Sequence, residues 1–282
     1  MSYSLNSLYE VVGISKQAVH QYQKRRLNFE EQLSALLVEV ESLRREHPGC
    51  GLEKMYYTLK PSFIGRDRFI DILKSLGYQL KKKPNYRRTT IRGPMRYPNK
   101  IKGLIIREPL QIWQSDITYI RIKESFYYAV FILDVYSKII VGYHISNHLR
   151  ASANVAALKK ALAAYGSPKY HHSDAGSQYV SKIYLKLLRG NKVEVSMGQR
   201  AQDNAYAERI NRTIKEEYLN KWQPQSYTQL QTKTAKAVQH YNEKRLHNHL
   251  DRKSPFNFIQ YWTKLKEEQR PKIEIYENDF LT

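Results

Sequence analysis

The sequence predicts an α/β fold, in which a mixed sheet flanked by helices is preceded by all-α helix-turn-helix modules. Up to about residue 77, apolar residues recur every three or four positions, which indicates amphipathic helices. After Pro109, β-branched and aromatic residues form short runs with tight turns between them. Three such runs are followed by alternating strands and helices, an order typical of a mixed sheet with helices on its faces.

Two helical units are predicted in the first 80 residues. The first has the spacing of a helix-turn-helix, with a turn at Gly13 and a second helix capped by Ser15. An ordinary helical hairpin would give the same pattern. The predicted helices cover residues 5–25 in two short pieces, 28–46, 51–59 and 66–76. We therefore expect a helix-turn-helix over 1–27 and a second helical DNA-binding module over 28–80. The candidate DNA contacts on these helices are Lys16, Arg66 and Arg68.

A strongly basic stretch follows these helices. The 282-residue chain carries a formal charge of +21, and no acidic residue lies between Asp71 and Glu108. Tyrosines are interleaved with the cations of this stretch, a composition that suits the backbone of a nucleic acid better than it suits a merely soluble surface. Prolines and glycines interrupt any regular element, so we expect residues 81–109 to form an extended basic linker. Its strongest candidate DNA contacts are Lys81, Lys82, Lys83, Arg87 and Arg88.

The remaining chain is expected to form a catalytic core over 110–222 and a C-terminal helical region over 223–282. The predicted strands cover residues 112–122, 126–135, 138–145, 169–173 and 192–196. The predicted helices cover residues 152–166, 178–188, a stretch that begins at Asp203 or Asn204, 226–245 and 255–267. The first three strands would form an antiparallel meander.

Three acidic residues stand out in this core. Asp116 lies in the middle of the first strand, and Asp174 ends the fourth. Taken singly, Asp116 could be an outward-facing strand residue and Asp174 a turn former before Gly176. First and fourth strands can be neighbours in such a sheet, however, and the helix after the last strand could bring Glu208 beside them. Three convergent carboxylates can hold two hard cations, and Mg²⁺ prefers such oxygen ligands.

The helix that carries Glu208 divides into two faces. Ala207, Ile210, Ile214 and Tyr218 form an apolar stripe, and Asp203 or Asn204 is expected to cap its first turn. A second face is polar and consists of Asn204, Glu208, Asn211, Arg212 and Lys215. Such a face normally points to water. Beside two strand-borne aspartates it could instead contact DNA, with Lys215 two turns beyond Glu208 and in a position to grip a phosphate.

The motifs of the chain resemble those of the DDE transposases, specifically the catalytic protein of the insertion-sequence-three family, over roughly residues 5–260. The matching motifs are Trp113-Gln114-Ser115-Asp116-Ile117-Thr118-Tyr119, Leu133-Asp134-Val135-Tyr136-Ser137-Lys138 with Val141-Gly142, His172-Ser173-Asp174-Ala175-Gly176-Ser177-Gln178-Tyr179, Asp203-Asn204-Ala205 with Glu208, Asn211 and Lys215, and Tyr241-Asn242 with Arg245, His247 and Pro255. The interval from Asp174 to Glu208 is a couple of residues shorter than usual in that family, and the deficit falls in a loop between Met197 and Asp203.

The resemblance implies a retroviral-integrase-like, ribonuclease-H-like core. It also implies that Asp116, Asp174 and Glu208 are both the catalytic residues and the metal ligands, with two Mg²⁺ or Mn²⁺ ions per active site. The implied partners are double-stranded DNA (terminal inverted repeats of the element, and target DNA), further copies of the chain on that DNA, and a small upstream helix-turn-helix protein with which family members are often fused by frameshifting. Asp134 would belong to the scaffold.

We therefore expect a transposase that cleaves a phosphodiester and transfers the strand. A non-catalytic DNA-binding repressor of transposition and a metal-dependent nuclease without strand transfer are the alternatives. Cys50 is the only cysteine, which excludes an intrachain disulfide and a cysteine-rich zinc module. The N-terminus shows no secretory signal, and the longest apolar run is too short for a bilayer. We therefore expect no membrane partner and a cytoplasmic, nucleoid-associated bacterial protein.

Overall fold

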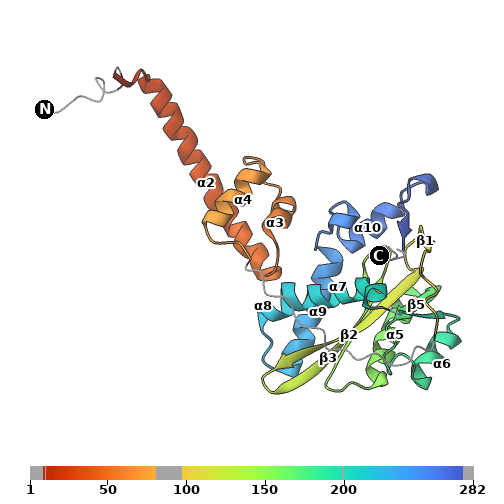
Figure 1. The fold of residues 1–282 in the computed structure, drawn as a ribbon. Helices are drawn as coiled ribbons and strands as arrows, with labels where there is room; N and C mark the ends of the chain where they lie inside the picture. Colours follow the sequence, from red (N-terminus) through yellow and green to blue (C-terminus); the bar gives the residue numbers. More distant parts are fainter. Residues whose placement is uncertain (1–8, 10, 81–96, 199, 276–282) are drawn as a thin grey trace, which may run out of the picture. The chain divides into compact units, whose positions relative to one another are not determined.

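The computed structural model of the chain describes residues 9, 11–80, 97–198 and 200–275. The chain divides into two compact units, Met1–Lys81 and Lys82–Thr282, and each is described by itself. Figure 1 shows helices α2, α3 and α4 in the first unit and all the strands in the second. Helices precede the sheet along the chain, as the sequence predicted.

The N-terminal unit packs two short helices against the second half of a long one. Its helices are α2 (Lys16–Glu46), α3 (Leu52–Leu59) and α4 (Arg66–Ser75). Ser15 caps α2 as expected, because its hydroxyl accepts a hydrogen bond from the backbone N–H of Ala18 (3.1 Å). Val40, Met55 and Phe69 are almost completely buried in the small core between the three helices. The helices predicted over 51–59 and 66–76 are therefore confirmed.

Helix α2 differs from the prediction. We expected one helix to end near residue 25 and another to begin at residue 28, but a single helix runs through this point. Residues 16–46 contain neither glycine nor proline, so nothing in the local sequence stops the helix. The boundary proposed between 27 and 28 thus falls inside α2. The first helix of the predicted helix-turn-helix lies mostly outside the described residues.

The predicted linker over 81–109 is wrong in its second half. Residues 81–96, with Lys81, Lys82, Lys83, Arg87 and Arg88, lie outside the described residues. Residues 97–109, however, pack onto the second unit: Ile101 and Ile106 are buried, and strand β1 (Ile105–Ile106) pairs with β7 (Ile273–Glu274). Their isoleucines join a core cluster with Leu250 and Phe258. Burial of these apolar side chains outweighs the basic character of the stretch.

The central sheet has the predicted topology. Its strands are β2 (Ile112–Ile122), β3 (Ser125–Asp134), β4 (Ile140–Ser146), β5 (Tyr170–Ser173) and β6 (Glu194–Met197). Their order is β4-β3-β2-β5-β6; β2, β3 and β4 are antiparallel neighbours, whereas β5 and β6 continue the sheet in parallel with β2. The first and fourth predicted strands are therefore neighbours, and the mixed, ribonuclease-H-like sheet is confirmed.

Helices cover the sheet and enclose two apolar clusters (Figure 1). One cluster is formed with α5 (Ala151–Tyr165) and α6 (Lys182–Gly190). Helix α5 approaches β4 so closely that a Cβ on Gly142 would lie 2.5 Å from the carbonyl oxygen of Ala157, so only glycine fits there. Helix α6 begins later than predicted, because residues 177–180 form a turn after Asp174.

The second cluster is formed with the helices that follow β6. These are the 3₁₀ helix η1 (Ala201–Asn204), α7 (Ala205–Thr213), the π-helix η2 (Ile214–Leu219), α8 (Asn220–Trp222) and α9 (Tyr227–Glu243). The apolar stripe predicted on α7 is confirmed, because Ala207, Ile210, Ile214 and Tyr218 are all buried. The chain continues through η3 (Asn248–Leu250), α10 (Pro255–Trp262), which ends earlier than predicted, and η4 (Glu267–Gln269).

Candidate active site

The sheet brings Asp116 and Asp174 to the same place. Strands β2 and β5 run in parallel, and their pairing ends where Ser115 lies opposite Ser173. Asp116 and Asp174 are the next residues on the two strands, so both follow the last paired position. Asp116 is half-buried in the middle of β2, and Asp174 is half-buried at the end of β5. The predicted neighbourhood of the two acids therefore results directly from the strand register.

Three side-chain hydrogen bonds fasten η1 and α7 to β2. Gln114 Nε2 donates to the carbonyl oxygen of Asp203 (3.2 Å), and Asn204 Nδ2 donates to that of Ser115 (3.0 Å). Asn211 Nδ2 donates to Asp116 Oδ2 (2.8 Å). These bonds join three consecutive residues of β2 to the end of η1 and to the second half of α7. The segment that contains Glu208 is thereby held against β2 from both sides.

The pKa of Asp116 depends on its burial and on the two other acids. Burial, the charge of Asp174 and, to a smaller extent, the charge of Glu208 together raise the pKa of Asp116 to about 7. The backbone N–H of Ile117 (2.8 Å) and the Asn211 amide oppose the shift by donating to the carboxylate. Two other acids thus lie close enough to Asp116 to repel its charge.

Asp174 is also a turn former, the alternative role that the sequence allowed. Its Oδ1 accepts a hydrogen bond from the backbone N–H of Gly176 (3.2 Å), and burial raises its pKa. A Cβ on Gly176 would lie 3.0 Å from that same oxygen, so the turn favours glycine. Asp174 therefore combines a local structural bond with a position next to Asp116.

The donor set suits a hard divalent cation. The three acids offer carboxylate oxygens, the ligands that Mg²⁺ and Mn²⁺ prefer, and after burial the charges of Asp174 and Glu208 contribute to the raised pKa of Asp116. Within the described part of the chain, no three His, Cys, Asp or Glu side chains are gathered closely enough to hold a metal ion as they stand. The fit to a cation therefore rests on the type and charge of the donors.

Buried polar side chains form hydrogen bonds between the strands that lead to the acids and the segment after Asp174. The Ser115 and Tyr179 hydroxyls share a hydrogen bond (2.9 Å), which links β2 to the turn that follows Asp174. His171 Nε2 and the Tyr184 hydroxyl share another (2.9 Å). Burial lowers the pKa of His171 to about 3 and that of His172 to about 4, so both imidazoles are neutral. Sequence reasoning missed these hydrogen bonds, whose only local signal is the tyrosines that follow Asp174.

The start of α7 differs from the predicted cap. No side-chain hydrogen bond caps the first turn of α7. Asp203 Oδ2 instead accepts from the backbone N–H of Arg200 (2.9 Å), and Asn204 reaches across to Ser115. The shortened interval after Met197 falls in the segment that leads into η1, of which residue 199 is not described. With this interval, Glu208 lies near enough to Asp116 for its charge to raise the pKa of Asp116.

Two predicted DNA contacts on this helix have unexpected surroundings. Asn211 is only 6% exposed and bonds Asp116, and its contact with DNA stays a prediction. Lys215 is half-buried: its Nζ lies 5.6 Å from the centre of the Tyr119 ring, and burial lowers its pKa. Glu217, two residues farther along, pairs with Arg245 (2.6 Å). Arg212 is exposed and stays a prediction.

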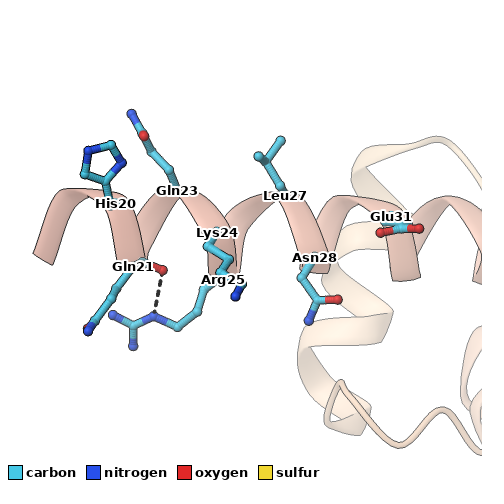
Figure 2. Close-up of a pocket in the computed structure, with 8 residues that line it drawn as sticks. All are labelled: His20, Gln21, Gln23, Lys24, Arg25, Leu27, Asn28 and Glu31. Atoms are coloured by element: carbon cyan, nitrogen blue, oxygen red, sulfur yellow. Dashed lines mark hydrogen bonds between the residues drawn. The ribbon is translucent and has the colours of Figure 1, made fainter. Parts of the chain in front are cut away.

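The candidate contacts of the N-terminal unit are on its surface. Lys16 is exposed; Arg66 pairs with Asp67 (2.8 Å), and the Arg68 guanidinium lies 4.4 Å from the centre of the Phe29 ring. Figure 2 shows a shallow hollow along the exposed first half of α2, where Arg25 Nε donates to the carbonyl oxygen of Gln21 (3.3 Å). Its lining is mostly neutral polar or basic, and it includes one apolar residue, Leu27, and one acidic residue, Glu31. This surface offers no cluster of carboxylates for catalysis.

Comparisons with known proteins identify the family of the core domain. Residues 107–202 match a family model described as an integrase core domain, and residues 189–255 match a second model with the same description. The two matches together extend from just after β1 to the first residue of α10. The chain therefore contains an integrase core domain.

The curated relatives are insertion-sequence proteins. The transposase of IS629 from Shigella sonnei is 34% identical over 157 residues, a match that covers 55% of this chain and 53% of that protein. The transposase of IS904 from Lactococcus lactis is 32% identical over 175 residues (58% of this chain, 67% of that protein). Transposase InsF of IS3A from Escherichia coli is 28% identical over 189 residues (58% and 65%). The chain belongs to the insertion-sequence-three family of DNA transposases.

The chain matches about half the length of the IS629 transposase. Among solved structures, the catalytic core domain of HTLV-2 integrase in complex with magnesium is 20% identical, with a TM-score of 0.46. That similarity covers 54% of this chain and 97% of the integrase core.

Proposed function

We propose that this chain is a two-metal DDE transposase in which Asp116, Asp174 and Glu208 hold Mg²⁺ or Mn²⁺. The observation that carries the proposal is the strand register that places Asp116 beside Asp174, with the charges of Asp174 and Glu208 adding to burial in raising the pKa of Asp116 to about 7. Membership of the transposase family supports it. Two divalent ions bound there would activate an attacking oxygen and stabilise the leaving oxygen of a phosphodiester.

The residues of the chain have distinct roles in this proposal. Asp116 would provide oxygen ligands from the middle of β2 and Asp174 from the position after β5, and Glu208 would complete the set from α7. Asn211 and Asn204 are positioning residues, because they fasten α7 to β2 on both sides of Glu208. Lys215 and Arg212 would contact the DNA backbone near the reacting phosphodiester.

The proposed substrate is double-stranded DNA. The enzyme would bind the terminal inverted repeats of its element, hydrolyse a phosphodiester at the element end, and direct the freed 3′ hydroxyl onto target DNA. The N-terminal unit and the basic stretch that includes Lys81–Lys83, Arg87 and Arg88 would bind the repeats. Several copies of the chain would assemble on the DNA, and a small upstream helix-turn-helix protein is a further candidate partner.

The proposed location is the bacterial cytoplasm, in association with the nucleoid. Among the helices that the structure describes, none has both the length and the apolar character needed to cross a membrane.

The test is strand transfer of an end-containing oligonucleotide by the full chain, with and without Mg²⁺ or Mn²⁺. A transposase gives metal-dependent joining of the end to a second DNA. A nuclease gives cleavage without joining, and a repressor binds the end without changing it. Binding without any metal-dependent product would contradict the proposal.

A further inference from the structure

The hairpin of β2 and β3 continues beyond the candidate active site. Strand β5 pairs with β2 only as far as Ser115, whereas β2 and β3 stay paired to the Ile122–Ser125 position. Within the described chain, the edge of β2 past Asp116 therefore has no neighbouring strand on the β5 side. Figure 1 shows this hairpin as the longest part of the sheet.

One face of this extension carries exposed aromatic rings. Side chains alternate along a strand, so Tyr119 and Arg121 point away from Ile120 and Ile122, which are buried in the core. Tyr119 is 49% exposed, and Phe126 on β3 is 51% exposed. Their ring centres are 6.4 Å apart in an edge-to-face arrangement. The core does not require these two rings, because the opposite face of the hairpin supplies the packing.

Cations accompany both rings. Lys215 Nζ lies 5.6 Å from the Tyr119 ring centre, and the Arg121 guanidinium carbon lies 5.8 Å from the Phe126 ring centre. Arg121 also pairs with Glu124 (3.1 Å) on the exposed hairpin turn, next to Lys123. The surface thus combines aromatic faces with three cations and one acid, a mixture that matches stacked bases joined by phosphates.

This surface meets the side of the acids at the open edge of β2. Tyr119 lies three residues beyond Asp116, about 10 Å along the strand, and by the same alternation its side chain is on the opposite face from that of Asp116. Lys215 comes from the Asp116 side, because it follows Asn211, which bonds Asp116, by four residues, and its ammonium still reaches the Tyr119 ring. A DNA strand with a phosphodiester at Asp116 would therefore have to pass around this edge, along Lys215, to reach the rings.

We propose that Tyr119, Phe126, Arg121 and Lys215 form a platform that binds unpaired bases at the end of the DNA substrate. Duplex DNA keeps its base faces inside the stack, so aromatic side chains can stack on bases only where the strands have separated. The platform would hold a frayed element end next to the acids. This inference rests on the proposed function, because it names the form of DNA that the same site receives.

The test compares two DNA ends on the full chain without divalent metal, so that no cleavage occurs. Both duplexes carry the terminal inverted repeat, and one has its last three base pairs mismatched. 2-Aminopurine in the last positions reports stacking by fluorescence, and anisotropy reports affinity. We expect the unaltered chain to prefer the mismatched end by about tenfold, the size of effect that stacking of one or two bases gives.

The double variant Tyr119→Leu/Phe126→Leu should lose this preference and the aminopurine signal while still binding the paired end. Both residues are exposed, so the fold should survive, and thermal unfolding checks this. The matched control is Tyr261→Leu, because Tyr261 is 41% exposed with the Lys253 ammonium 4.3 Å from its ring centre, on α10. It should behave like the unaltered chain.

An unaltered chain without preference, or a double variant that keeps it, overturns the platform. A protein partner on this surface would give the first of these results. Strand transfer of a pre-frayed end with Mg²⁺ separates the two proposals. Its absence in the unaltered chain contradicts the transposase function, whereas normal transfer without any preference contradicts the platform alone.

Discussion

Two aspartates on neighbouring strands, Asp116 on β2 and Asp134 on β3, have opposite surroundings. Asp134 is fully buried and accepts three hydrogen bonds, from the Leu110 N–H (2.8 Å), the Ser137 N–H (2.7 Å) and the Ser137 hydroxyl (2.5 Å). Asp116 is half-buried and accepts from Ile117 and Asn211, with two further acids nearby.

Burial raises the pKa of both carboxyls, but the other contributions differ. Donors from Ser137 and Leu110 and the charge of Lys138 oppose the shift at Asp134, whereas Asp174 and Glu208 add to it at Asp116. A buried acid that is surrounded by donors stabilises the fold, and an acid that is crowded by other acids is suited to hold a cation. The comparison assigns Asp134 to the scaffold, as the family resemblance implied, and Asp116 to the proposed site.

The largest expected effect is on catalysis. Asp116→Asn, Asp174→Asn and Glu208→Gln should each reduce cleavage at least about a thousandfold, or roughly 4 kcal/mol, because each removes a proposed metal ligand. DNA binding, measured by anisotropy, should survive in all three. Single-turnover cleavage with Mg²⁺ is the measurement. A variant that cleaves within a few-fold of the unaltered chain would show that its residue is not a ligand.

Replacing Asp134 and replacing Asp116 should have opposite effects on the free energy of unfolding. Asp134→Ala leaves three buried donors without an acceptor and should cost about 3 to 5 kcal/mol in the free energy of unfolding. Asp116→Asn relieves repulsion and should be neutral or stabilising in the absence of metal. Urea unfolding of each variant measures both, with Asp251→Ala on the surface as the control. Equal destabilisation by both changes would remove the distinction.

The pH dependence of stability gives a further test. The pKa of Asp116 is raised from 3.8 in the unfolded chain to about 7 in the fold, so the folded state binds the extra proton between these values. Its contribution to the stability of the metal-free protein is therefore present at pH 4 and disappears as the pH rises through 7. Asp116→Asn should flatten this part of the profile in urea titrations. An unchanged slope in the variant would mean that Asp116 ionises normally.

The hydrogen bond from Asn211 should have a moderate effect through Asp116. Asn211→Leu keeps the volume but removes the donor, so we expect about a tenfold weaker Mn²⁺ affinity, or roughly 1.4 kcal/mol. Because Asn211 would act by orienting Asp116, adding Asn211→Leu to Asp116→Asn should change metal binding no further. Calorimetry on the four proteins of this cycle is the measurement. Additive losses would show that Asn211 acts on the fold in general.

Lys215→Ala should have the smallest effect. An ammonium cannot ligate a metal ion, so Mn²⁺ binding should be nearly intact while affinity for the DNA end falls by about three- to tenfold. Glu208→Gln should do the reverse. Calorimetry and anisotropy on the two variants make the comparison. If Lys215→Ala leaves the affinity for the DNA end unchanged, Lys215 does not contact the DNA.

The sequence predicted the sheet well because its signals are local. Runs of β-branched and aromatic residues defined β2 to β6 closely, and the strand register then brought Asp116 and Asp174 together. Helix α2 was less predictable, since a continuous helix differs from two shorter ones only by the absence of a stop signal. Residues 97–106 were misjudged because their burial depends on β7, which lies more than 160 residues away.

The contacts that the helix with Glu208 makes with the sheet could not be predicted from local sequence patterns either. The spacing of the sequence placed Asn204, Glu208 and Asn211 on one face of the predicted helix. It did not indicate what this face packs against. The bonds from Asn204 to Ser115 and from Asn211 to Asp116 join residues about 90 positions apart. The same is true of Lys215 over Tyr119. Such contacts follow from how α7 packs on the sheet, which no spacing in one segment reveals.

The central claim is that Asp116, Asp174 and Glu208 together bind divalent metal, and calorimetric titration of Mn²⁺ into the full chain tests it most directly. We expect binding to the unaltered chain and a large loss in Asp116→Asn, Asp174→Asn and Glu208→Gln. Glu216→Gln, an exposed acid farther along the same helical stretch, should bind as the unaltered chain does. Unchanged binding in any of the three variants, or no binding by the unaltered chain, would contradict the account.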